Sequence, residues 1–188
     1  MIMSTPSDPV AAPAWTIRPE QPIDLDQIHD LYRATFAGPS TAELVDAVRS
    51  GADFLADLTL VGVTDDGSVL GHVLVSRVAL QPDEDGAPNV DVLSLGPVAV
   101  LPPHQGRGIG TALIREALAV ADTTRDEPLT VVIGSQALFG RFGFVPAADL
   151  GVSGPYESAG DAFAVRPRPG APAIPGGTVI YPPALAPA

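Results

Sequence analysis

The sequence predicts a mixed α/β fold built on a mostly antiparallel sheet, organised as a single domain. Its 188 residues suit one domain with a sizeable core. Apolar residues recur at helical spacing in some segments and gather into short Val- and Leu-rich runs in others. These segments follow the order β-α-α-β-β-β-α-β-α-β-β, which is not the regular alternation of a parallel βαβ array. We therefore expect one domain over residues 15–188.

The first third of the chain predicts a short strand, Trp15–Arg18, and two helices. Asp24 is placed to cap the first helix, which ends at Gly38-Pro39. Thr41 is placed to cap the second helix, which closes at Gly51.

The middle of the chain predicts three strands. Residues 58–63 and 69–80 are rich in Val and Leu, and the turn Asp65-Asp66-Gly67-Ser68 between them predicts a β-hairpin. Residues 90–100 form a third apolar run, which Gly96-Pro97 interrupts.

The last third alternates short elements with loops. Residues 109–121 predict an amphipathic helix, residues 129–133 a buried strand, and the segment up to Gly143 a brief helical turn. Two further strands, at 161–165 and 178–181, lie between loops rich in proline and glycine.

The composition excludes several classes of protein. Acidic residues outnumber basic ones by 22 to 10, for a net charge of −12, and such a surface repels the phosphates of nucleic acids. The acidic excess either serves solubility or forms a cleft that attracts cationic amines, and the sequence leaves both readings open. The absence of cysteine excludes disulfides, thiolate metal sites and a cysteine nucleophile.

Residues 1–14 predict a flexible lead-in and not a targeting signal. They contain no basic residue and no apolar run, and they are rich in Ser, Thr, Pro and Ala. No stretch of the sequence approaches the roughly 18 uncharged apolar residues that span a bilayer. We expect a cytoplasmic protein without membrane or nucleic-acid partners, and a homodimer is compatible with the sequence.

The strongest functional signal is the segment Gln105-Gly106-Arg107-Gly108-Ile109-Gly110-Thr111, which leads from the third apolar strand into a helix. Three alternating glycines without Cβ atoms let backbone N–H groups converge on an anion at a helix N-terminus. A diphosphate is the natural ligand. The Rossmann fingerprint needs glycine where Thr111 stands, and a P-loop needs a Gly-Lys-Ser/Thr run, so neither nucleotide motif matches.

Pro97 adds a second part to this candidate site. Proline inside a central strand removes a ladder hydrogen bond, so it marks an edge or a bulge. A strand that bulges there splays from its neighbour and leaves backbone groups of Val98, Ala99 and Val100 in need of partners. Coenzyme A, with pantetheine amides followed by a diphosphate, fits this layout; an ordinary edge strand facing water is the alternative.

In these residues the chain resembles the GNAT superfamily of acyl-CoA-dependent N-acyltransferases. Gln105–Gly110 is similar to the Gln/Arg-x-x-Gly-x-Gly/Ala signature, and Val98–Pro102 to the strand before it. Gly140–Pro146 and Gly177–Leu185 resemble the YhbS-like acetyltransferases. The resemblance covers roughly the whole predicted domain, and it implies a twisted, mostly antiparallel sheet, splayed at the cofactor site and flanked by helices.

The resemblance also implies acetyl-CoA as the co-substrate. It assigns the pantetheine and acetyl carbonyl to backbone groups of the strand, and the diphosphate to the amides of the glycine turn with the Thr111 hydroxyl. Arg107 either adds charge near a phosphate or is a solvated loop residue. The residues expected to bind the cofactor are Val98, Ala99, Val100, Gln105, Gly106, Arg107, Gly108, Ile109, Gly110 and Thr111.

The catalytic residues stay unassigned, because the resemblance weakens at the positions that carry them. Many family members place a tyrosine that protonates the departing thiolate where this chain has Phe139. Some place an acidic residue that deprotonates the amine where this chain has Ser94. Asp91 is the nearest carboxylate, three positions away, and strand alternation points it to the other face.

The other polar residues leave alternatives open. His104 either contacts the cofactor or substrate, or is a surface loop residue, and His72 is either a base or a hydrogen-bonded sheet residue. Tyr32, Tyr156 and Tyr181 each offer a phenol, and their spacing does not choose among them. The histidines lack metal-ligand spacing, so we expect no metal.

The leading hypothesis is an N-acetyltransferase that passes acetyl from acetyl-CoA to a primary amine of a small molecule or peptide by direct attack. The alternative is an acyl-CoA-binding or regulatory module that catalyses weakly or not at all, because Phe139 and Ser94 are not the usual occupants of their positions. A third reading, a nucleotide-binding protein, is disfavoured by the failed fingerprints.

Overall fold

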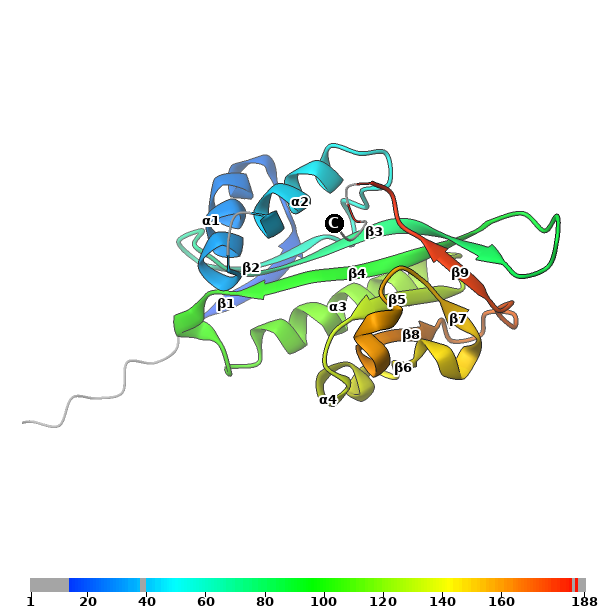
Figure 1. Cartoon of the computed structure of the whole chain (residues 1–188). Helices are drawn as coiled ribbons and strands as arrows, with labels where there is room; N and C mark the ends of the chain where they lie inside the picture. The colour runs from blue at the N-terminus through cyan, green and yellow to red at the C-terminus, as the bar shows by residue number, and fades with distance from the viewer. Residues whose placement is uncertain (1–13, 38–39, 184, 186–188) are drawn as a thin grey trace, which may run out of the picture.

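A computed structural model describes residues 14–37, 40–183 and 185 of the chain, which form nine strands and four α-helices (Figure 1). The predicted helix end at Gly38-Pro39 and the predicted lead-in, apart from Ala14, lie outside the described residues. The strands are β1 (Trp15–Pro19), β2 (Leu60–Thr64), β3 (Val69–Pro82), β4 (Val90–Val100), β5 (Leu129–Ile133), β6 (Val145–Pro146), β7 (Val152–Ser153), β8 (Phe163–Pro167) and β9 (Gly177–Ile180). The helices are α1 (Leu25–Thr35), α2 (Ser40–Arg49), α3 (Ile109–Thr124) and α4 (Gln136–Phe139).

All strands belong to one sheet with the order β1-β2-β3-β4-β5-β8-β6. The far end of β3 also pairs with β9, which in turn pairs with β7. Neighbouring strands are antiparallel except in the pairs β4–β5 and β7–β9, which are parallel. This topology confirms the predicted mixed fold with a mostly antiparallel sheet.

Helices cover both faces of the sheet. Figure 1 shows α1 and α2 on one face and α3 on the other. Two clusters of buried apolar side chains fill these layers, one around Ile28 and Val45 and the other around Leu113 and Ile114. Central strands covered on both faces have little need for polar residues, which explains the continuous apolar runs in β2 and β3.

Gly71 of β3 lets α3 lie close to the sheet. A Cβ atom at this position would lie 2.9 Å from Cγ2 of Ile109 and 3.1 Å from Cδ1 of Leu113. These are closer than ordinary van der Waals contacts, so any larger residue would push the start of α3 outward. The glycine turn immediately precedes this helix, and its position depends on the contact.

Most predicted elements are present with shifted ends. The predicted helix at 109–121 continues to Thr124, and the predicted strand at 161–165 lies at Phe163–Pro167.

The prediction that the Asp24 side chain caps α1 is wrong. Its carboxylate instead accepts hydrogen bonds from Arg18, at 2.6 and 2.8 Å, and from the backbone N–H of Gln21 at 2.8 Å. Because Asp24 closes a 3-10 turn before α1, its oxygens point back along the chain.

Within the described ranges, no helix is long and apolar enough to cross a membrane.

Candidate active site

The site begins where β4 and β5 separate. The two strands pair at only two positions, Leu93 with Thr130 and Ser94 with Val131. Beyond them β4 continues to Val100 with no strand partner on that side in the described part of the chain. The sheet is therefore splayed at this end, and backbone groups of β4 face the gap.

A bulge in β4 lies at the point of separation. Val98 opposes Val73 of β3, and Leu95 opposes Val75, so Gly96 and Pro97 together face a single residue of β3. An extra residue of this kind bends the strand that carries it and disrupts its ladder. The bulge predicted at Pro97 is confirmed.

Hydrogen-bond alternation decides which backbone groups of β4 face the gap. The Leu101 N–H donates to the Leu70 carbonyl of β3 at 2.9 Å. In an antiparallel pair, every second residue of a strand forms its backbone hydrogen bonds with the same neighbouring strand. Ala99, two residues before Leu101, therefore also bonds to β3. Val98 and Val100 therefore direct their N–H and C=O groups toward the gap. The Val100 carbonyl accepts a hydrogen bond from Nε2 of Gln105 at 3.0 Å.

A cavity of about 730 Å³ occupies the gap, within the range of roughly 300–1,000 Å³ typical of ligand sites. Its walls are the second half of β4, the glycine turn, the start of α3, the end of β5, α4 with the turn that follows it, and the end of α1. Of the predicted cofactor residues, eight line it: Val98, Val100, Gln105, Gly106, Gly108, Ile109, Gly110 and Thr111. Ala99 and Arg107 are not among its lining residues.

The glycine turn holds a row of unpaired backbone donors. Gly106 and Gly108 have φ values of +72° and +85°, which residues with a Cβ atom rarely adopt. Within the described part of the chain, the N–H groups of Gly106–Thr111 have no hydrogen-bond acceptor, and the first bond of α3 runs from Ala112 to Gly108. A Cβ atom at Gly106 or Gly108 would meet open space. The turn therefore fits an anionic group such as a diphosphate at the helix N-terminus.

Arg141 is a lining residue that the sequence did not single out. The 3-10 turn Gly140–Phe142 after α4 carries this cation to the cavity. The sequence did contain a signal for Arg141: it lies within Gly140–Pro146, one of the segments that carry the family resemblance. His104 also lines the cavity.

The two usual catalytic positions carry no acid or base in the structure. Phe139 is buried, lines the cavity and packs edge-to-face against Phe144 with ring centroids 5.7 Å apart. Ser94 lies in the last pair before β4 and β5 separate. Asp91 pairs instead with Arg77, at 3.4 Å. A phenylalanine cannot supply a proton, so the usual acid is absent from its position.

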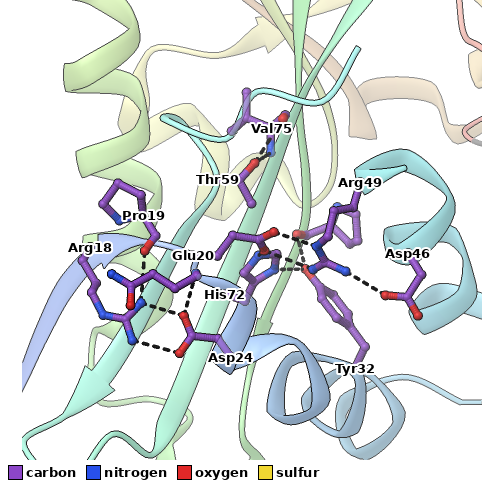
Figure 2. Close-up of polar contacts among 12 residues, drawn as sticks. Arg18, Pro19, Glu20, Asp24, Tyr32, Asp46, Arg49, Thr59, His72 and Val75 are labelled. Atoms are coloured by element: carbon purple, nitrogen blue, oxygen red, sulfur yellow. Dashed lines mark hydrogen bonds and ion pairs between the residues drawn. The ribbon is translucent and has the colours of Figure 1, made fainter. Parts of the chain in front are cut away.

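A buried polar network supports the bulge from the side of α1 (Figure 2). The Tyr32 hydroxyl lies 2.8 Å from both the Pro97 carbonyl and Nδ1 of His72, and its one proton is shared between these two acceptors. Nε2 of His72 lies 2.9 Å from Oε2 of Glu20, whose other oxygen accepts from Nε of Arg49 at 2.6 Å. His72 has no exposed surface, which supports its reading as a hydrogen-bonded sheet residue.

Burial and pairing set the charges of this network. Burial lowers the pKa of His72 and outweighs the opposite influence of the Glu20 carboxylate, so the imidazole is neutral. Burial alone would raise the pKa of Glu20, but hydrogen bonds from His72 and Arg49 hold it below its ordinary value. Burial also raises the pKa of Tyr32 well above its ordinary value. The network thus contains one buried anion, Glu20, compensated by Arg49.

We expect the free energy of unfolding to fall as the pH is lowered from 7 to 5. The unfolded chain protonates His72 near its ordinary pKa of about 6.5, whereas the folded site resists protonation to lower pH. The unfolded state then binds more protons, so stability decreases as the pH drops through this window. Urea unfolding at several pH values measures it. His72→Gln keeps a hydrogen-bond donor for Glu20 but does not titrate, so its free energy of unfolding should change less between pH 7 and pH 5. An equal change in the wild type and the variant would contradict the assignment of this pH dependence to His72.

Comparison with known proteins agrees with this geometry. Residues 25–144 match the profile of the Acetyltransferase (GNAT) family. The N-acetyltransferase YhbS of Escherichia coli K12 is 32% identical over 152 residues, which cover 80% of this chain and 85% of YhbS. The N-acetyltransferase YjhQ of the same strain is 28% identical over 134 residues, 71% of each chain.

Two solved structures are similar over nearly their whole length. Escherichia coli YhbS in complex with CoA superposes with a TM-score of 0.79 at 28% identity and covers 95% of this chain and 94% of its own. A GNAT family acetyltransferase from Brucella melitensis in complex with acetyl-CoA gives a TM-score of 0.69 at 31% identity, with 92% and 99% coverage.

The splayed sheet, with a glycine turn that leads into α3, has the fold of an acyltransferase of the acyl-CoA type. The chain belongs to the Acetyltransferase (GNAT) family. The predicted family and its YhbS-like branch are confirmed.

Proposed function

We propose that this chain is an N-acetyltransferase that takes its acetyl group from acetyl-CoA and passes it to a primary amine. The observation that carries the proposal is a continuous row of backbone groups along one cavity, which runs from Val98 and Val100 at the splayed strand into the free amides of Gly106–Thr111. The similar structures from Escherichia coli and Brucella melitensis, which hold CoA and acetyl-CoA, support it.

The residues divide by the part of the co-substrate that they fit. Val98 and Val100 offer backbone groups to the pantetheine amides and the acetyl carbonyl, as an added strand would receive them. The amides of Gly106–Thr111 suit the diphosphate, and Arg141 adds a cation to the same cavity. Ala99 and Arg107 lie outside the lining, and we leave them out of the proposed set.

The reaction is direct acyl transfer. The amine nitrogen attacks the thioester carbonyl, a C–N bond forms, the C–S bond breaks, the nitrogen loses a proton and CoA leaves as its thiol. A thiol with a pKa near 8.5 leaves tolerably without an enzymic acid, which is compatible with Phe139 at the usual acid position. An alkylamine, with a pKa near 10.4, must first lose a proton, so water or an unassigned group takes it.

We propose residues 15–188 as one acetyltransferase domain; the cytoplasmic location and a homodimer stay predictions.

Thiol release from acetyl-CoA over a panel of primary amines tests the proposal. We expect release above the buffer rate with at least one amine, together with an acetylated product in mass spectra. The side chain of Phe139 favours one alternative, an acyl-CoA-binding module without turnover. Binding of acetyl-CoA with no release for any amine would support that alternative and contradict the enzyme.

A further inference from the structure

A second, smaller cavity lies against the bulge. Its volume is about 180 Å³, and it shares Leu95, Gly96, Pro97 and Ile133 with the larger cavity. The point at which β4 and β5 separate therefore contributes to the walls of both spaces. The remaining walls come from α2, β4, the loop after β7 and the segment after β9: Thr41, Leu44, Ser94, Tyr156, Tyr181 and Leu185.

The smaller cavity is apolar and uncharged. Tyr156 and Tyr181 pack edge-to-face in its wall, with ring centroids 5.2 Å apart, and the Tyr156 hydroxyl donates to the Leu185 carbonyl. None of its lining residues, all within the described part of the chain, carries a carboxylate, ammonium or guanidinium group.

The wall contains the buried hydroxyl of Tyr181 beside that of Ser94. Tyr181 is 9% exposed, and its hydroxyl makes no hydrogen bond within the described residues. Ser94 lies beside it and slightly lowers its pKa, yet the two hydroxyls do not reach hydrogen-bond geometry. Burial has the larger influence and raises the pKa of Tyr181, so the phenol stays neutral. The cavity thus offers neutral hydrogen-bonding groups and no ionic partner.

The volume restricts what this cavity holds. An apolar protein cavity of about 150 Å³ takes up benzene, so 180 Å³ accommodates one six-membered ring and little more. Placing a charged group there would leave it desolvated and unpaired, which is strongly unfavourable. A ring next to Gly96 and Pro97 places a short attached chain at the larger cavity.

We infer that the smaller cavity binds the body of the acceptor, and that the acceptor is an arylalkylamine with an uncharged ring and a primary amine on a short chain. The inference rests on the acetyltransferase function proposed above. The ring occupies the space between α2 and the tyrosine pair, and the amine extends past Gly96-Pro97 toward the acetyl-CoA site. Polyamines and acidic amino acids are excluded as good acceptors because they would bring charge into the apolar cavity.

Steady-state kinetics with 2-phenylethylamine, spermidine and glutamate test this assignment. We expect kcat/KM for 2-phenylethylamine to exceed that for spermidine and glutamate by at least about tenfold, roughly 1.4 kcal/mol. A higher kcat/KM for spermidine or glutamate would overturn the assignment. Turnover of none of the three would overturn it as well.

Substitutions of Leu44 locate the ring, because this residue lines the smaller cavity and not the larger one. Leu44→Trp fills the space and should raise KM for 2-phenylethylamine at least about tenfold without changing the Kd of acetyl-CoA. Leu44→Ala enlarges it and should favour a naphthyl amine over the phenyl one. Leu150→Trp, at an exposed leucine outside both cavities, is the matched control and should change neither constant.

The outcomes separate the inference from the function on which it rests. If the wild-type protein does not bind acetyl-CoA, the proposed function and the inference are both contradicted. Normal acetyl-CoA binding and turnover, with KM unchanged in Leu44→Trp and ring preference unchanged in Leu44→Ala, would overturn the inference alone.

Discussion

Gly108→Glu is expected to weaken acetyl-CoA binding by at least about 100-fold, roughly 2.7 kcal/mol. Gly108 lies at the centre of the glycine turn with a φ of +85°, and its missing Cβ leaves open space in front of the free amides. A glutamate there places negative charge where the diphosphate would lie and strains the left-handed backbone. Calorimetric titration of acetyl-CoA measures the change.

Gly86→Glu is the matched control for this substitution. Gly86 also has a positive φ, +80°, with open space around its Cα, but it lies in the loop between β3 and β4, away from the glycine turn. The control introduces the same side chain, charge and backbone strain, and should bind acetyl-CoA like the wild type. Equal affinity of the folded Gly108→Glu protein and the wild type would show that the turn does not hold the diphosphate.

Arg49→Met is expected to lower the free energy of unfolding by about 3 kcal/mol. Arg49 compensates the Glu20 carboxylate, which is only 5% exposed, through hydrogen bonds of 2.6 and 3.0 Å. Methionine retains most of the side-chain length but leaves a buried carboxylate without its cation. Urea unfolding followed by circular dichroism measures the loss.

Arg125→Met removes an arginine from a more exposed ion pair and serves as the control. Its partner Asp57 is 53% exposed, so the pair is screened by water and its loss should cost at most about 1 kcal/mol. A loss for Arg49→Met no larger than that for Arg125→Met would contradict the role assigned to the buried network.

The cofactor site was largely predictable because its signals are local. The glycines of the turn and Pro97 report backbone conformations that each residue imposes on its own neighbourhood. The sequence therefore predicted both the bulge and the turn. It did not reveal that the backbone groups of Ala99 are hydrogen-bonded to β3 and so are turned away from the gap, because this depends on the register between two strands.

The buried network was not predictable, because its members come from separate elements. Tyr32 and Arg49 lie on α1 and α2, His72 lies on β3, and Glu20 follows β1 (Figure 2). Each looks like an ordinary surface or sheet residue in its own segment, and only the packing of helices on the sheet brings them together. Long-range polar contacts of this kind leave no periodicity in the sequence.

The smaller cavity was missed for the same reason. Ser94 attracted notice as an unusual occupant of the position for the base, and Tyr156 and Tyr181 as phenols without an assignment. These three side chains come together because β9 pairs with β3 and because the segment after β9 brings Tyr181 and Leu185 into the same cavity wall as Leu44 of α2. Spacing along the chain could not predict that contact.

Amide hydrogen exchange of the wild-type protein, with and without saturating acetyl-CoA, measures the backbone groups on which the proposed function depends. Slower exchange on binding is predicted for Val98, Val100 and the amides of Gly106–Thr111, with no change in the loop around Gly86. Exchange at Gly106–Thr111 that stays as fast with acetyl-CoA as without it would contradict the proposed site.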